Sequence, residues 1–131
     1  MKASTREWVT KAEEDFAAAS ILARPRKKPL WSPVCFHAQQ CAEKYLKARL
    51  NEASMAIHRT HDLELLLNHV LPREPLWAAF RPALKRLGDV DVAVVPRYPG
   101  SFTTKAEAQR ALKTCKSFRK EARSSLGLPV K

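Results

Sequence analysis

The chain has 131 residues, a formal net charge of +11 and only 3 glycines. This length predicts one compact domain spanning residues 1–131, and the scarcity of glycine favours helices over a sheet with many tight turns. The positive charge favours nucleic acid, nucleotides or an acidic protein as partners, and no apolar run approaches the ~18 residues that span a bilayer, so we expect no membrane association.

The first predicted helix begins at STRE, where Ser4 and Glu7 match a capping box, in which each side chain bonds a free backbone amide. Apolar residues then recur at three- and four-residue steps and predict one buried face: Trp8, Ala12, Phe16, Ala19 and Leu22. The acidic residues 13–15 flank this face and are expected near the positive end of the helix dipole. The helix should end by Arg24, because Pro25 disfavours helical geometry in the residue before it.

A second helix is predicted from about Pro33 to Asn51, with Ser32 as its N-cap residue and Pro33 in the favoured first turn. Its buried side is expected to hold small and apolar residues: Cys35, Ala38, Ala42, Tyr45 and Leu46. Glu43 and Lys47 lie one helical turn apart, which fits a surface ion pair as well as a shared polar or phosphate-contacting role.

Two shorter helices are predicted next. Residues 58–72 contain one, capped by Thr60 or Asp62, with an apolar stripe at Leu63, Leu66, Leu67 and Val70. In the segment that follows, Pro82 predicts a kink or a break near Ala79. The apolar residues that fall in register along this segment are Leu76, Phe80, Leu84 and Leu87.

Residues 90–102 are the one stretch of β-like composition, and because two prolines cross it we expect an extended loop. The last helix opens with a second capping box, Thr104 with Glu107, and Gly127 is a good stop signal. Its predicted outer side is basic: Lys105, Arg110, Lys113, Lys116, Arg119, Lys120 and Arg123. Four to five amphipathic helices with short links predict an all-α, up-and-down antiparallel bundle.

Histidines and cysteines raise the question of a metal site. His37 and Cys41 share a helix face, and His58 with His61 has helical spacing, so the two pairs could meet as a tetrahedral site. Neither pair has zinc-finger spacing. The alternative, in which cysteines fill the core and histidines lie at a helix face or cap, needs no metal. We expect no metal and no cofactor.

The cysteines also raise the question of a thiol nucleophile. Cys35 falls in the first turn of the second predicted helix, where the helix dipole would favour its thiolate, but no recognised motif flanks it. The odd number of cysteines, 3, favours reduced thiols. The polar start MKASTREWVTK lacks the apolar core of a signal peptide, so we expect a cytoplasmic protein.

Four segments, in this order, resemble the HEPN domain, a small helical domain shared by higher eukaryotes and prokaryotes: WVTKAEEDFAAA (8–19), CFHAQQCAEKYLKARL (35–50), THDLELLL (60–67) and PRYPG (96–100). The resemblance covers nearly the whole chain. It implies a bundle of four to five helices, usually a homodimer, with a nucleotide-binding role. It also implies a minimal nucleotidyltransferase as a partner, in a pair of the toxin–antitoxin type.

Many HEPN proteins are metal-independent ribonucleases, whose signature R-x4–6-H brings an arginine and a histidine together across the dimer. No arginine of this sequence precedes a histidine at that spacing, since Arg49 lies too far before His58 and Arg59 is too close to His61. We therefore expect no catalytic residues, and interpret the chain as a non-catalytic module that binds a nucleotide, RNA or an anionic partner.

Eight residues are candidate site residues, four for phosphate binding and four for an interface or a structural motif. The expected phosphate contacts are Lys44, Lys47, His61 and Arg97. The residues expected at an interface or in a structural motif are Gln39, Gln40, Glu43 and Tyr98. Two alternatives remain open, in which Arg97 anchors its loop to a carboxylate and His61 caps its helix. The competing function is a ribonuclease toxin with another arrangement, such as Arg97, Tyr98 and a histidine.

Large aromatic residues in or beside the predicted connections favour a homodimer: Trp31, Trp77, Phe80, Tyr98 and Phe102. The loop VAVVPRYPGSF is also apolar for an exposed segment, which is typical of a contact surface. We expect this loop and the second helix near a two-fold interface. The alternative is that the loop packs on its own bundle and buries Tyr98 there.

Overall fold

The computed structural model describes residues 1–89 and 103–131. These residues form the helices α1 (Ala3–Leu22), α2 (Trp31–Glu52), α3 (Leu63–Val70), α4 (Arg81–Leu87) and α6 (Lys105–Ser125), with a 3-10 helix, η1 (Pro75–Phe80). No strand occurs among them. The predicted all-α fold class is therefore confirmed.

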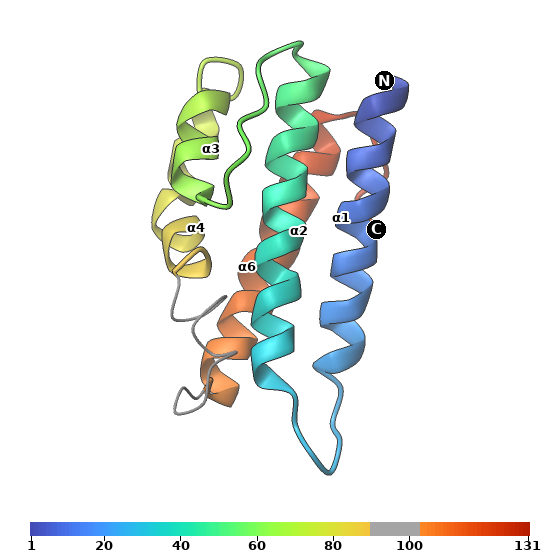
Figure 1. The fold of residues 1–131 in the computed structure, drawn as a ribbon, viewed down its shortest axis with the longest axis vertical. Coiled ribbons are helices and arrows are strands. Elements are labelled where there is room, and N and C mark those ends of the chain that lie inside the picture. Colours follow the sequence, from blue (N-terminus) through green and yellow to red (C-terminus); the bar gives the residue numbers. More distant parts are fainter. Residues whose placement is uncertain (90–102) are drawn as a thin grey trace.

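Helix α2 is the centre of the bundle. The long helices α1, α2 and α6 lie side by side, and α3 and α4 line one side of α2 and α6 (Figure 1). Twelve residues of α2 are buried, more than in any other described helix, because it packs against α1, α3, α4 and α6. Side chains on α2 are therefore well placed to be fixed by several neighbours at once.

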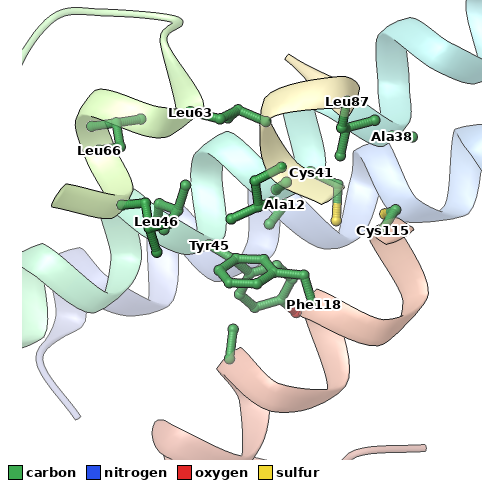
Figure 2. Packing of buried hydrophobic residues seen from close by; sticks show 14 of the residues in the cluster. Ala12, Ala38, Cys41, Tyr45, Leu46, Leu63, Leu66, Leu87, Cys115 and Phe118 are labelled. Atoms are coloured by element: carbon green, nitrogen blue, oxygen red, sulfur yellow. The ribbon is translucent and has the colours of Figure 1, made fainter. Parts of the chain in front are cut away.

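The core is built from the apolar faces of all the helices. Figure 2 shows Tyr45 and Leu46 of α2 packed among Ala12 of α1, Leu66 of α3 and Phe118 of α6. Burial of the 23 apolar core residues that the structure describes removes water from these faces and supplies the main driving force for folding. The expected buried side of the second helix is confirmed, since Cys35, Ala38, Ala42, Tyr45 and Leu46 are each at most 1% exposed.

The first two predicted helix starts are wrong. Helix α1 begins at Ala3 and α2 at Trp31, and neither has a side-chain cap. The Ser4 hydroxyl accepts a hydrogen bond from Asn51 at 2.7 Å, and the Ser32 hydroxyl donates to Thr103 at 2.9 Å. Each serine thus bonds a distant segment of the chain, and its own helix starts one or two residues earlier than the local signal predicts.

In the middle of the chain, the predicted helix cap and the predicted helix break are both present. Asp62 caps α3, accepting a hydrogen bond from the Leu65 amide at 3.2 Å, and α4 begins at Arg81 with Pro82 in its first turn. The preceding residues form η1, whose tighter winding changes which side chains face inward. Leu76 is consequently 86% exposed, against its predicted place in the buried stripe, and Trp77 is buried instead.

Helix α6 begins and ends as predicted. Thr104 and Glu107 form the capping box, and Gly127 follows the helix with a φ of +75°, a conformation that glycine adopts without strain. Two residues of its predicted basic outer side are wrongly placed. Arg119 is only 9% exposed and the Arg123 side chain only 13% exposed, because both turn inward to the Glu13 carboxylate of α1.

Candidate functional site

Polar side chains form a row of two hydrogen-bonded groups along α2, where this helix faces α1 and the segment that precedes α3. We call this row the polar seam and define it by eight residues: Asp15, His37, Gln39, Gln40, Glu43, Lys44, Lys47 and His61. Residues 37, 40, 44 and 47 of α2 recur at steps of three and four, which places them on one side of the helix. Buried polar groups of this kind are stable only when they are hydrogen-bonded to one another.

Glu43 is the centre of the seam. Its carboxylate accepts hydrogen bonds from Lys47 Nζ at 3.0 Å and from Gln39 Nε2 at 3.4 Å, and it lies 2.8 Å from His61 Nδ1. The Glu43 and Lys47 side chains are only 4% and 9% exposed, so they are a buried pair and not the surface pair that their spacing also allowed. The His61 side chain, by contrast, is 79% exposed.

Two further contacts fix the surroundings of Glu43. Gln39 donates to the His61 backbone carbonyl at 3.1 Å, and Gln40 donates to the Gln39 side-chain oxygen at 2.7 Å. Lys47 also lies 5.6 Å from the centre of the Trp8 ring on α1, a cation–π contact. The imidazole of His61 is therefore held on one side by a buried, fully bonded carboxylate, while most of its surface faces solvent.

Asp15 of α1 forms the second charged group of the seam. It lies 2.8 Å from His37 Nδ1 and accepts a hydrogen bond from Lys44 Nζ. Asp15 is in the middle of α1 and is 8% exposed, so its partners on α2, and not the helix dipole, compensate its charge. From the sequence, Asp15 was related to the helix dipole and His37 to Cys41, and their contact was missed, because this contact depends on how α1 and α2 face each other.

The structure joins five of the eight candidate residues in one hydrogen-bonded group: Gln39, Gln40, Glu43, Lys47 and His61. Lys44, the next residue after Glu43 on α2, belongs to the neighbouring group around Asp15. Lys44 is 23% exposed and Lys47 is 9% exposed, and each already contacts a carboxylate. His61 is the most exposed of the seam's ion-paired side chains. The other two candidates, Arg97 and Tyr98, lie outside the described residues.

A second charged cluster joins the three long helices beside the seam. Arg119 of α6 donates two hydrogen bonds of 2.7 Å to Glu13 of α1, and Tyr45 of α2 donates to the same carboxylate. Burial alone would raise the pKa of Glu13, but the hydrogen bonds from Arg119 and Tyr45 outweigh it and lower this pKa. The pKa of Tyr45 is raised, first by burial and then by its bond to Glu13.

The three cysteines are buried and unpaired. Burial raises the pKa of Cys35 to about 11, and Cys35 is in the second turn of α2 because the helix begins at Trp31. The pKa of Cys41 lies well above its ordinary value, first because of its hydrogen bond with Cys115 and then because of burial. Figure 2 shows these two side chains in the same part of the core. Because the pKa of each is raised, the Cys35 and Cys41 thiols are expected to be protonated and unreactive at neutral pH.

The histidines contact different partners and do not all meet at one site. His37 contacts Asp15, His61 contacts Glu43, and the ring of His58 stacks on that of His69 with 4.1 Å between centroids. In residues 1–89 and 103–131, no three His, Cys, Asp or Glu side chains are grouped so that they could hold a metal ion. Among the same residues, no helix is both long enough and apolar enough to cross a membrane.

These features define an all-helical domain with three long helices, a side layer of short helices and a polar seam along the central helix. A HEPN domain family model matches residues 5–125 of the chain, which is nearly its whole length. The chain therefore belongs to the HEPN domain family, as its sequence motifs predicted. Searches of curated proteins and of solved structures found no match.

Proposed function

We propose that this HEPN domain is a non-catalytic binding module that holds the phosphate of a nucleotide, or an anionic group of a partner protein, at the exposed end of the polar seam. One observation carries the proposal: the imidazole of His61 is 79% exposed while its Nδ1 atom lies 2.8 Å from the buried Glu43 carboxylate. A histidine fixed in this way presents its second ring nitrogen outward in a constant orientation.

The other candidate residues contribute differently. Lys44, which is 23% exposed, retains surface from which it could turn to an anion, whereas Lys47 lies beneath and supports Glu43. Lys47 contacts the same carboxylate as His61, so its positive charge lies close to His61 and favours phosphate over a neutral ligand. Arg97 is proposed, from the sequence alone, as a further contact.

Titration with ATP, GTP and a short RNA at low salt tests the nucleotide version of the proposal. Saturable binding below millimolar ligand is expected for at least one of them. Its absence would contradict the nucleotide version and would leave the anionic partner protein. A minimal nucleotidyltransferase is the partner that the family resemblance implies, and pull-down with a nucleotidyltransferase encoded beside this chain is the matching experiment.

A ribonuclease is the second candidate function. The observation that favours it is the same His61–Glu43 contact, since general bases in enzymes are often histidines oriented by a carboxylate. Against it stands the missing R-x4–6-H spacing in the sequence. Incubation with total RNA for hours, beside an active HEPN ribonuclease, separates the two functions, because intact RNA would exclude the enzyme.

A further inference from the structure

The outer side of α6 carries an unusually one-sided charge. Its exposed residues include five cations and a single acid, Glu121; the cations are Lys105, Arg110, Lys113, Lys116 and Lys120. We call these five residues the α6 basic face. They lie opposite the buried side of the helix, which holds Ala111, Cys115 and Phe118. From Lys105 to Lys120 the face extends about 22 Å, at 1.5 Å per residue.

These cations are not neutralised within the part of the chain that the structure describes. None of the five takes part in an ion pair or a side-chain hydrogen bond there, whereas Lys11 on α1 pairs with Glu14, and Lys44 and Lys47 on α2 contact carboxylates. Other exposed cations without an ion pair among the described residues, such as Arg24, Lys27 and Lys28, lie in a connection and not on one side of a long helix. The α6 basic face leaves five positive charges on one rigid helix available to an external polyanion.

The residues between the cations narrow the class of polyanion. The exposed positions of the face that are not charged hold small or polar side chains, Ala106, Gln109, Ser117 and Ser124, with no aromatic residue among them. Proteins that hold single strands combine cations with aromatic platforms on which the bases stack, and amphipathic helices that lie on membranes need exposed apolar side chains. The face has neither feature.

We propose that the α6 basic face binds double-stranded nucleic acid through its phosphates, independently of base sequence. A duplex carries about one negative charge per 1.7 Å along a straight axis, which suits a straight row of cations without base-stacking groups. Contacts of lysine and arginine with phosphates position a protein on a duplex without reading its bases. This inference is independent of the proposed site at His61, because the two surfaces share no residue.

The test compares two variants of the full chain that lose the same charge. One replaces three cations of the face (Lys113→Gln, Lys116→Gln and Lys120→Gln). The control replaces three exposed cations of the α1–α2 connection (Arg24→Gln, Lys27→Gln and Lys28→Gln). Binding of a 20-base-pair DNA duplex is measured by fluorescence anisotropy at several salt concentrations. The same measurement uses an RNA duplex, a single strand of the same sequence, polyglutamate and anionic phospholipid vesicles.

For the unchanged protein we expect duplex binding whose affinity falls with salt at a slope of about −3 to −5 in a log–log plot, since each phosphate contact contributes about 0.9. The face variant should bind the duplex at least about tenfold more weakly, and the magnitude of its salt slope should fall by about 3. The control should lose no more than about threefold in affinity. Equal losses in the two variants would overturn the proposal. So would an unchanged protein that does not bind the duplex, or that binds a single strand, polyglutamate or vesicles more tightly. Circular dichroism checks that both variants are folded.

Discussion

His61 Nδ1 lies 2.8 Å from the Glu43 carboxylate, and the two side chains differ sharply in exposure, at 79% for His61 and 4% for Glu43. The carboxylate therefore belongs to the interior of the bundle, while the imidazole belongs to its surface. Gln39 strengthens the connection, because it contacts both the Glu43 side chain and the His61 backbone. The segment before α3 is thus attached to α2 by its polar groups as well as by apolar packing.

Loss of Glu43 should destabilise the fold strongly. Glu43→Ala leaves the buried Lys47 ammonium without its carboxylate, and removal of one partner of a buried ion pair costs about 3–5 kcal/mol. The double variant Glu43→Leu with Lys47→Met should lose less than about 2 kcal/mol, because no buried charge is left unpaired. Urea unfolding measures both values.

The control for this experiment is Lys11→Met, which breaks the exposed Lys11–Glu14 pair and should change the free energy of unfolding by less than about 0.5 kcal/mol. A Glu43→Ala variant as stable as this control would show that Glu43 and Lys47 do not form a buried pair.

The stability of the protein should fall in acid partly because of Glu13. Its hydrogen bonds from Arg119 and Tyr45 lower the folded-state pKa, so its contribution is fully present above the unfolded carboxyl pKa of about 4.3 and is lost as the pH falls through the lower folded value. Glu13→Gln should cost about 1–3 kcal/mol at pH 7 and much less at pH 3.

The neighbouring Glu14 provides the matched control for Glu13. Its one ion pair within residues 1–89 and 103–131, with Lys11, is exposed, so Glu14→Gln should change stability little at either pH. Urea unfolding at pH 7 and pH 3 compares each of the two variants with the unchanged protein. If Glu13→Gln lowers the free energy of unfolding by the same amount at both pH values, the role given to the contacts of Glu13 with Arg119 and Tyr45 is contradicted.

The thiols should be unreactive in the folded protein. All three cysteines are buried, and the pKa of Cys35 is raised to about 11, so few thiolates are present or accessible at pH 8. A coloured disulfide reagent should label the native protein much more slowly than the protein in denaturant, where all three react. Rapid labelling of Cys35 in the native protein would contradict this and would revive a role for it as a nucleophile.

Local signals predicted several features of the fold correctly. Asp62, the Thr104–Glu107 pair and Gly127 each act on backbone groups within a few residues, so the sequence around them was sufficient. The apolar stripe of α3 was also predicted from a local signal, the spacing of its apolar residues. The break before α4 followed from Pro82, whose ring excludes a continuous α-helix.

Apart from the exchange of Leu76 and Trp77, which follows from the winding of η1, the features that sequence reasoning missed depend on distant partners. The hydroxyls of Ser4 and Ser32 bond residues 47 and 71 positions away, which removes them from their predicted capping roles. Arg119 reaches Glu13 across 106 positions, so its helical position alone suggested an outer residue. The family motif did point to Glu43 and Lys47, but only the packing of Trp8 and the segment at His61 reveals that this pair is buried.

The family resemblance and the apolar sequence of residues 90–102 lead us to predict a homodimer. Light scattering at micromolar protein should give twice the chain mass of 14.8 kDa. Val94→Asp and Tyr98→Ala should each shift the protein toward the monomer if residues 90–102 take part in the interface. A clean monomer mass for the unchanged protein would contradict the dimer, and a dimer that survives both substitutions would contradict this position of the interface.

The most direct test of the proposed function compares two histidines of the same segment. His61 is held by Glu43, whereas His58 stacks on His69 and makes no side-chain hydrogen bond or ion pair with a seam residue, so His58→Ala is the matched control for His61→Ala. Calorimetric titration with ATP at low salt should give saturable binding below millimolar ligand for the unchanged protein and for His58→Ala. His61→Ala should bind at least about tenfold more weakly, a difference of about 1.4 kcal/mol. Equal affinities for His61→Ala and the unchanged protein, or no saturable binding by the unchanged protein, would contradict the proposed nucleotide site.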